Sequence, residues 1–425
     1  MAHKRKAEEE LPESGRPPVK QRLDSADSLP YPSLSSSPSK VPAIQRPSPI
    51  LTFSYNSDHV LEFNDSALRY YVEPPRGADL GFHYEKWIKR PEERGRIDGL
   101  LTAWSRFKKT LHASSPSPSV VNVPDVNVMC WRGIMTKILA APYEERDGWD
   151  LNVMLVKGTL YFEEHLSDAK LEEKNEMTPR QRLQSYYGYA FESYCTTSQP
   201  DSQGAPGWGG DVNTNVQWCS VVKTKLADRR VIIGGEVDCV RGTYSGKTDN
   251  YVELKTSLSI RNASDEARFE KKLLKFYLQS FLLGVPEIIV GFRTPSGRLT
   301  TVQLLRTAEI PRLVRGKPGA WDPSICLEWG DRFLTFLQAK VDSDSGRQVW
   351  RVSFKPRVGI TAVMLNEAEV AEVVNGEEHV GFLPRWYWDE LMAVHHDSGA
   401  QSRVDDTSTT RSNTESTGLP SGWRI

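Results

Sequence analysis

The hydrophobic and polar positions along the chain follow two different periods, and together these predict a series of strands interleaved with helices. Apolar and aromatic residues alternate with polar ones, or form short runs between turn residues, in segments typical of β-strands. These predicted strands are Ile50–Tyr55, Leu61–Phe63, Tyr70–Val72, Leu151–Val156, Gly158–Phe162, Arg230–Val240, Tyr251–Ser257, Glu287–Phe292, Leu299–Leu305, Val349–Lys355 and Gly359–Leu365. Turn residues at 157–158 and 294–297 join two neighbouring pairs into hairpins.

Helical periodicity occurs between these strands. A short helix is expected after Arg132, and a longer one begins at Thr178-Pro179, where a Thr cap precedes a proline at the first helical position. A third helix, of about twenty residues, starts near residues 262–265 and ends at Gly284, because glycine suits the C-terminal cap of a helix. A last helix surrounds residues 386–394. The interleaved strands and helices predict one large α/β (α+β) domain.

The two ends of the chain differ in composition from its middle. Residues 1–47 are rich in Ser, Pro, Lys and Glu and poor in large apolar residues, so we expect them to be disordered. Within them, the basic residues at 4–6 and 20–22 have the spacing of a two-part nuclear import signal, although a solubilising charged tail would look the same. Residues 398–425 are rich in Ser, Thr and Asp and are also expected to be disordered. The remaining residues, 48–397, are predicted to form a single domain.

Composition and charge exclude several classes of protein. The 425 residues carry a formal net charge of −1, so phosphate binding requires local clusters of Lys and Arg. The five cysteines include no C-x-x-C pair, which argues against a zinc site and for a reducing compartment. The longest apolar stretch, Phe281–Phe292, is interrupted by Gly284, Pro286 and Glu287, so no membrane span and no membrane partner are expected. The N-terminal residues are basic and then acidic and do not form a secretory signal, so the protein is expected to be soluble and intracellular.

The strongest chemical pattern is Glu236-Val-Asp238 followed, after fourteen intervening residues, by Glu253-Leu-Lys255. Residues i and i+2 of a strand point to the same face. If the two segments pair as an antiparallel hairpin, three carboxylates and the Lys255 ammonium converge on one patch. Three carboxylates that close repel one another unless a cation lies among them. Hard oxygen ligands in that number suit Mg²⁺ or Mn²⁺, as in sites that hold two ions and hydrolyse phosphate esters.

Such charges can also form a solvent-facing ladder on a half-buried sheet. The apolar residues around them, Val231-Ile-Ile and Tyr251-Val, favour the functional interpretation. The spacing D-x14-E-x-K is also the pattern of the PD-(D/E)XK nuclease core. In that arrangement Lys255 orients the attacking water or neutralises charge on the phosphate.

Two helices contribute further candidates. Gly188-Tyr-Ala-Phe-Glu192 places Glu192 one turn after a glycine, whose missing side chain would let another element approach closely. Glu192 is thus a fourth candidate carboxylate. On the helix 263–283, the amide of Gln279 lies among apolar residues and needs partners, and Lys275 one turn earlier is expected to face the same cleft.

These motifs together resemble those of the DXO-type family of RNA 5′-end decapping nucleases. In order, they are Arg132 within Trp-Arg-Gly, Gly188–Glu192, Glu236-Val-Asp238, Glu253-Leu-Lys255, and Lys275 with Gln279 ahead of Ser-Phe-Leu. The resemblance covers nearly all of residues 48–396 and is strongest to the fungal nuclear branch, whose members partner an XRN-type 5′–3′ exoribonuclease.

The resemblance implies two mixed β-sheets with flanking helices and a PD-(D/E)XK-like active site in a deep pocket between them. It implies hydrolysis of incompletely capped RNA 5′ ends that carry a triphosphate, an unmethylated cap or an NAD cap. The metal ligands would be Glu192, Glu236, Asp238, Glu253 and the main-chain carbonyl of Leu254. Lys255 and Gln279 would contact the attacking water or the scissile phosphate, and Arg132 would clamp phosphates.

Two other functions fit part of this pattern. A PD-(D/E)XK nuclease acting on DNA would keep the fold, but a broad basic surface is not indicated by the near-neutral charge. A non-catalytic scaffold that activates the exoribonuclease would be expected to lack an acidic ligand, and all are present. Activation of the exoribonuclease is therefore expected as a second role beside catalysis. Both roles are expected in the nucleus.

Overall fold

The computed structural model describes residues 28–32, 34, 41–114, 125–200, 207–341 and 346–400, with side chains up to residue 393. The candidate import signal at 4–6 and 20–22, and nearly all of the segment 398–425, lie outside the described residues. Part of the N-terminal segment predicted to be disordered is ordered. Residues Ser28–Pro30 form strand β1, which pairs with β16, and Tyr31 donates a hydrogen bond to the carbonyl of Pro142.

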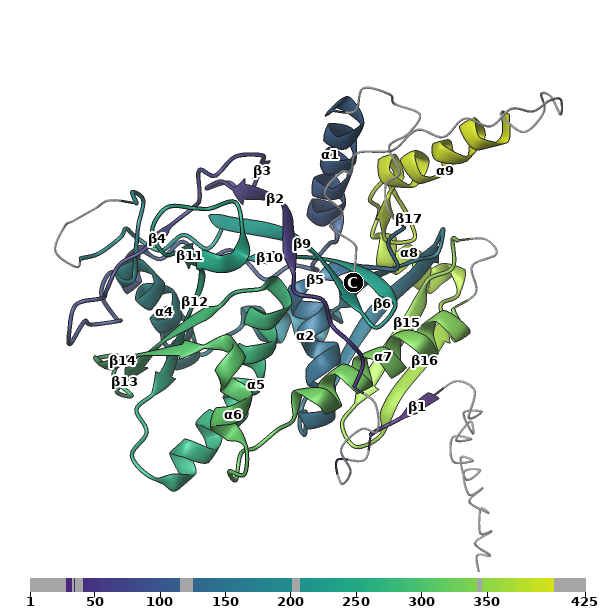
Figure 1. Ribbon diagram of the computed structural model, residues 1–425. Coiled ribbons are helices and arrows are strands. Elements are labelled where there is room, and N and C mark those ends of the chain that lie inside the picture. Colours follow the sequence, from purple (N-terminus) through teal and green to yellow (C-terminus); the bar gives the residue numbers. More distant parts are fainter. Residues whose placement is uncertain are drawn as a thin grey trace, which may run out of the picture.

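The larger of two mixed sheets crosses the molecule from one edge to the other (Figure 1). Parallel pairing of β5 with β10 and with β7 is combined with antiparallel pairing elsewhere. In spatial order its strands are β1 (Ser28–Pro30), β16 (Gly359–Met364), β15 (Trp350–Lys355), β6 (Trp149–Val156), β7 (Thr159–His165), β5 (Val128–Trp131), β10 (Arg229–Glu236), β9 (Gln217–Leu226), β2 (Ser48–Tyr55) and β3 (Leu61–Glu62).

The smaller sheet lies beside the larger one and is also mixed. Its strands are, in order, β14 (Leu299–Arg306), β13 (Glu287–Arg293), β12 (Tyr251–Leu258), β11 (Cys239–Val240), β4 (Tyr70–Tyr71) and β8 (Thr196–Thr197). A separate pair, β17 (His379–Val380) and β18 (Leu383–Pro384), precedes the last helix. The two mixed sheets agree with the architecture that the family resemblance implied.

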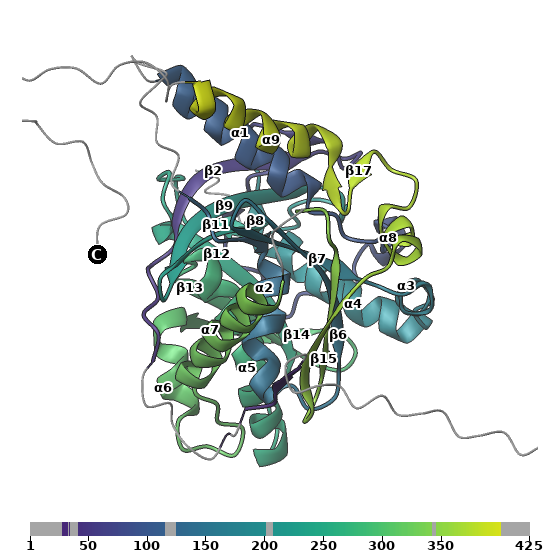
Figure 2. The same ribbon diagram turned by 90° about the vertical axis from the view of Figure 1, so that its right-hand side faces the viewer.

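Helices cover the sheets in layers (Figures 1 and 2). They are α1 (Asp98–Ser114), α2 (Arg132–Ala140), α3 (Asp168–Asn175), α4 (Pro179–Tyr194), α5 (Ala263–Leu283), α6 (Ile310–Val314), α7 (Pro323–Lys340), α8 (Glu367–Val374) and α9 (Arg385–Ala400). The predicted boundary signals are confirmed. Thr178 caps α4 and Gly284, with φ of 73°, caps α5.

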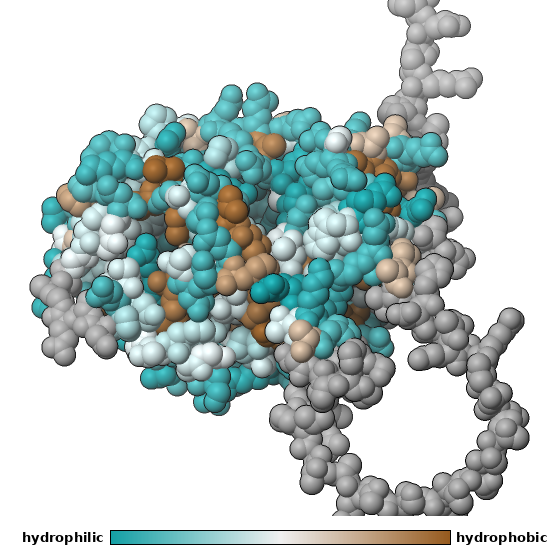
Figure 3. Space-filling view, turned by 90° about the horizontal axis from the view of Figure 1, so that it is seen from above, coloured by the Kyte–Doolittle hydropathy of each residue, from teal (hydrophilic) through white to brown (hydrophobic). Residues whose placement is uncertain are grey.

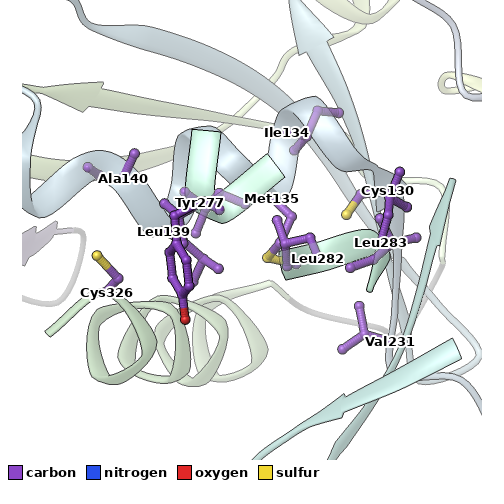
Figure 4. Close-up of a cluster of buried hydrophobic side chains, with 14 of the residues drawn as sticks. Cys130, Ile134, Met135, Leu139, Ala140, Val231, Tyr277, Leu282, Leu283 and Cys326 are labelled. Atoms are coloured by element: carbon purple, nitrogen blue, oxygen red, sulfur yellow. The ribbon is translucent and has the colours of Figure 1, made fainter. Parts of the chain in front are cut away.

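The alternation of side chains along each strand builds three hydrophobic cores. Val231 and Ile233 face the helices α2, α5 and α7, whereas Ile232 faces α1 and α9. In the smaller sheet, Val252 and Leu254 face α4. Figure 4 shows the central core, where side chains of α2 pack against those of α5. The site described below lies where this helix layer meets both sheets.

The surface is mainly polar on the face seen in Figure 3, where apolar side chains form narrow bands between hydrophilic ones. Among the described residues, no helix has both the length and the apolar character needed to cross a bilayer.

Candidate active site

The carboxyl ends of two parallel strands form the base of the site. Strands β5 and β10 pair with Trp131 opposite Gly234, so Arg132, the first residue of α2, lies next to Glu236, the last residue of β10. The Arg132 Nη1 donates a hydrogen bond to the main-chain oxygen of Glu236 at 3.0 Å. Gly235 permits this approach, because a Cβ at that position would lie 2.9 Å from the Cβ of Arg132. The guanidinium is thereby fixed over the end of the strand.

Directly after β10 the chain passes from the larger sheet to the smaller one. The Val237 N–H still donates to the oxygen of Trp218 in β9, at 2.9 Å. Two residues later, Cys239 pairs with Val252 in β12. Asp238 therefore lies at the crossing between the sheets, and its Oδ2 accepts a hydrogen bond from the Leu254 N–H at 2.6 Å.

The antiparallel hairpin predicted between residues 230–240 and 251–257 does not form as a whole. Its carboxylates nevertheless lie close to one another. Only Cys239–Val240 of the expected strand pairs with β12, and the rest of it, Arg229–Glu236, belongs to the other sheet. Glu236 and Asp238 thus do not share one face of one strand. They approach each other because the two sheets meet between them.

Strand β12 supplies the most buried carboxylate of the site, Glu253, and the lysine that pairs with it. The Glu253 side chain is fully buried and faces α2, where its Oε2 accepts from Arg132 at 3.1 Å. Its Oε1 accepts from the Lys255 Nζ at 2.5 Å, and the same ammonium lies 3.9 Å from Asp238 Oδ2. Arg132 was expected to clamp phosphates. In this structure its Nη1 holds the Glu253 carboxylate and the end of β10, and its contact with phosphate stays a prediction.

Helix α4 brings the fourth carboxylate, Glu192, to the site. The aromatic residues Tyr187, Phe191 and Tyr194 are buried against the smaller sheet and fix the helix. The predicted role of Gly188 is wrong, because a Cβ there would meet no atom within 4 Å. The helix is therefore positioned by its aromatic face, and the missing side chain of Gly188 is not needed for close packing.

The electrostatics of the four carboxylates show uncompensated negative charge. Burial, together with the nearby charges of Asp238 and Glu236, raises the pKa of Glu192 well above its ordinary value. Burial and a neighbouring carboxylate raise the pKa of Glu236 to about 7 and that of Asp238 to about 6. Burial alone would raise the pKa of Glu253 as well, but the charges of Arg132 and Lys255 lower it.

This donor set fits a divalent metal. Only oxygen donors are present, which Mg²⁺ and Mn²⁺ prefer, and the two fixed cations leave part of the carboxylate charge unbalanced. The residues that would hold the ion are Glu192, Glu236, Asp238 and Glu253. The main-chain carbonyl of Leu254 stays a predicted ligand.

A cavity of about 390 Å³ opens onto this set and is bordered by Glu192, Glu236 and Asp238. Sequence reasoning did not identify several of its other residues. Gln217 of β9 donates to Glu236 Oε2 at 2.9 Å. Tyr189 lies one turn before Glu192 on α4, a spacing from which it could have been found. The basic residues at 69, 89 and 90 also border the cavity, and no local pattern marks them.

The two candidates on α5 lie differently from expectation. The prediction that Lys275 faces this cleft is wrong. Its side chain is 58% exposed, pairs with Glu144 at 2.9 Å, and borders a second cavity that also contains Lys137 and Glu164. Gln279 is half-buried one turn before Leu283, whose Cδ1 lies 3.0 Å from the Cβ position of Gly235. Gln279 therefore lies on the helix face nearer to Arg132, and its contact with substrate stays a prediction.

Comparisons with known proteins agree with this geometry. The model of the family described as "RAI1 like PD-(D/E)XK nuclease" matches residues 45–388. The chain is 34% identical to "Decapping nuclease RAI1" of Mycosarcoma maydis, over 84% of this chain and 90% of that protein. It is 34% identical to "Decapping and exoribonuclease protein" of Xenopus laevis, over 81% and 86%.

Solved structures show the same fold. Rai1 of Candida albicans in complex with pU5 and Mn²⁺ has a TM-score of 0.73 and 27% identity, covering 86% of this chain and 99% of that one. Rai1 of Scheffersomyces stipitis in complex with (3′-NADP)⁺ and a calcium ion has a TM-score of 0.73 and 28% identity, covering 86% and 100%. The chain therefore belongs to the family of RAI1-like PD-(D/E)XK nucleases, and it is a decapping nuclease, a hydrolase.

Proposed function

We propose that this protein hydrolyses incompletely capped RNA 5′ ends, removing pyrophosphate, an unmethylated cap dinucleotide or an NAD cap. The observation that carries the proposal is the convergence of three carboxylates, from α4, β10 and the sheet crossing, at a cavity of about 390 Å³, with the fully buried Glu253 of β12 paired to Lys255 close to Asp238. A cavity of this size suits one nucleotide at the end of a single strand better than the groove of a duplex. The ligands pU5 and (3′-NADP)⁺ in the related structures support a nucleotide substrate.

The side chains divide the chemical work. One or two bound Mg²⁺ or Mn²⁺ ions would stabilise charge on a phosphoryl oxygen and lower the pKa of a bound water. Lys255, held by Glu253 and near Asp238, is placed to neutralise charge that develops on the scissile phosphate. Burial would lower its pKa, but the charges of Glu253 and Asp238 raise it, so Lys255 stays protonated at neutral pH. Arg132 orients Glu253 and would clamp phosphates, and Gln279 would contact the attacking water or the scissile phosphate.

End-labelled RNAs test this proposal. RNAs carrying a triphosphate, an unmethylated cap, a methylated cap or an NAD cap are incubated with the protein in Mg²⁺, Mn²⁺ or EDTA, beside single-stranded and duplex DNA. We expect metal-dependent release of the 5′ group, lost in the Glu236→Ala/Asp238→Ala variant. Turnover of DNA alone would favour the DNA nuclease. No turnover of any end by folded protein with metal would leave the activating scaffold.

We also propose that the protein acts in the nucleus and stabilises or activates an XRN-type 5′–3′ exoribonuclease. The basic residues at 4–6 and 20–22 support the nuclear location, since their spacing suits a two-part import signal. Both parts are tested separately. Replacing the two basic groups by glutamine should move a fluorescent fusion out of the nucleus. Gel filtration of the protein mixed with the exoribonuclease should give a joint peak, and separate peaks would refute the partnership.

A further inference from the structure

Two cationic side chains in the active-site cavity have no counter-charge. Arg69 and Lys89 both border the cavity and are half-buried. Across the described part of the chain, neither forms an ion pair or a side-chain hydrogen bond, whereas their neighbour Arg90 pairs with Glu93 at 3.1 Å. A partly buried cation without a partner loses hydration and gains nothing in exchange. Such a pair in a cavity that also holds a catalytic acidic set indicates a site for an anion.

The backbone holds both cations in fixed places. The main-chain oxygen of Arg69 accepts from the Val240 N–H at 3.0 Å, two residues after Asp238. Lys89 follows Ile88, which exchanges hydrogen bonds with the opposite loop. The Ile88 N–H donates to Val212 at 3.0 Å, and its oxygen accepts from Thr214 at 3.1 Å. The backbone at or next to both residues is therefore anchored by hydrogen bonds where it borders the cavity.

An exposed aromatic ring borders the same cavity. Tyr189 is 38% exposed although it lies one turn before Glu192 on a helix that is otherwise fixed by buried aromatics. The ring of Trp87 supports it, with the two ring centroids 5.8 Å apart. A supported ring that stays exposed beside a phosphate-binding site is a platform on which a nucleobase stacks.

In the described part of the chain, no acidic residue of the cavity lies within ion-pair distance of Arg69 or Lys89. Asp211 is occupied by His83 at 2.5 Å and by Lys86 at 3.8 Å, and Glu93 by Arg90. Three carboxylates of the metal site, Glu192, Glu236 and Asp238, border the same cavity. The cavity thus combines two cations without ion pairs and the carboxylates that would bind the metal.

We propose that Arg69, Lys89 and Tyr189 form a nucleotide-binding wall, in which the two cations contact phosphates of the RNA strand and the ring stacks on one base. This inference rests on the proposed function and names how that site selects its substrate. A substrate of this wall has a single-stranded end, with backbone phosphates near the scissile bond that the two cations can contact. The wall recognises the backbone and one base face, so binding does not depend on base identity.

Equilibrium binding tests the wall without catalysis. The probe is a 3′-fluorescein pentanucleotide with a 5′ monophosphate, measured by fluorescence anisotropy in Mg²⁺ with the Asp238→Asn variant as background, at several salt concentrations. Adding Arg69→Gln and Lys89→Gln should weaken binding by about ten-fold or more and lower the slope of log K against log salt by about 0.7 for each lost phosphate contact. Tyr189→Leu should weaken binding about five-fold or more without changing the slope, and Tyr189→Phe should not.

The matched control is Arg76→Gln, which removes the same charge from an exposed position outside the cavity. It should leave affinity and slope unchanged, and Arg69→Lys should restore most of the slope. If the cation variants fold with an unchanged melting temperature and bind like the background, the wall does not exist, even where the wild type hydrolyses RNA ends. If the wild type turns over no RNA end but the slopes change as expected, the proposed hydrolysis is wrong and the RNA-binding wall stands.

Discussion

Two acidic clusters of this protein use similar residue types, and their surroundings differ. The second cluster ties α1, β7 and the β17 pair together. Arg96 donates to Glu163 at 2.9 Å and lies 3.2 Å from Glu377. His379 lies 3.2 Å from Asp98 and 3.4 Å from Glu377. The ligand atoms of Asp98, Glu377 and His379 lie within 4.8 Å of one another, which is close enough for a metal.

The two clusters differ in what balances the negative charge of their carboxylates. None of these residues borders the two cavities described above, and Arg96 already occupies the position next to Glu377 that a cation would take. We call this second cluster closed, because it borders neither cavity, and the active-site cluster open. Burial raises the pKa of Glu163 to about 8, so a proton can balance the charge of the closed cluster. The active-site carboxylates face a cavity instead, where a divalent cation can enter. Closely spaced ligand atoms alone therefore do not mark a functional site. Unbalanced charge beside an open cavity does.

The largest expected effect separates the two clusters by activity. Asp238→Asn should lower the single-turnover rate about 100–1,000-fold, the scale seen when a charge that acts on the transition state is removed. Asp98→Asn, with the same chemical change in the closed cluster, should leave the rate unchanged. Rates are measured with end-labelled triphosphate RNA in saturating Mn²⁺. An equal loss in both variants would mean that the closed cluster also acts in catalysis.

Stability should show the opposite order. Arg96→Met removes the bonds from Arg96 to Glu163, to the Val374 oxygen and to Glu377, and should lower the free energy of unfolding by about 1–3 kcal/mol at pH 7, where Glu163 is largely protonated. Arg132→Met should cost less, because Lys255 still pairs with Glu253 and added Mn²⁺ can replace the lost positive charge. Urea denaturation with and without Mn²⁺ measures both. A loss in Arg132→Met that Mn²⁺ does not reduce would contradict an exchangeable cation in the open cluster.

A smaller effect should appear in the pH dependence of stability. The folded-state pKa values of Glu192, Glu236 and Asp238 are raised above their unfolded values. Their contribution is therefore complete below about pH 4 and is lost as the pH rises through about 6 to 7. Without metal the melting temperature should fall across that range, and Mn²⁺ should restore it increasingly as the carboxylates ionise.

The control for this pH effect is the Glu236→Gln/Asp238→Asn variant. It keeps Glu163, whose raised pKa contributes with the same sign, so the difference between the two proteins isolates the open cluster. The variant should show a flatter pH profile and little response to Mn²⁺. An identical profile and response in both proteins would assign the effect to groups outside the active site.

The sequence allowed most elements to be predicted where local signals were strong. The helix α5 ends at Gly284, as expected, and the hairpin of β6 and β7 turns through Lys157 and Gly158, both with positive φ. Strong signals of this kind act within a few residues. The helix α7 begins with an N-cap Asp322 and Pro323, yet it was not predicted, because buried residues on much of its surface obscure the helical period.

Long-range pairing could not be predicted from the same signals. The apolar pattern of residues 230–240 continues through Val237, and nothing local shows that the chain changes sheets there. The candidate carboxylates were nevertheless correctly brought together, since each lies on or next to an element that enters the core. Lys275 was misplaced for a related reason. It lies one turn from Gln279, but α5 extends well past the site and its outer turns contact other elements.

The smallest expected effect concerns what positions Glu192 in the open cluster. If the aromatic face of α4 fixes the helix, Gly188→Ala should be harmless to activity and should stabilise the protein by about 0.5–1 kcal/mol, because alanine is the better helix former and meets no atom within 4 Å. Gly291→Ala should do the reverse, since its Cβ would lie 2.4 Å from Phe191 Cε2 and displace the ring beside Glu192. Overpacking of that kind costs about 1–3 kcal/mol. Urea midpoints and single-turnover rates decide between them, and a loss of activity in Gly188→Ala would show that substrate or a neighbouring segment comes close to that face of the helix after all.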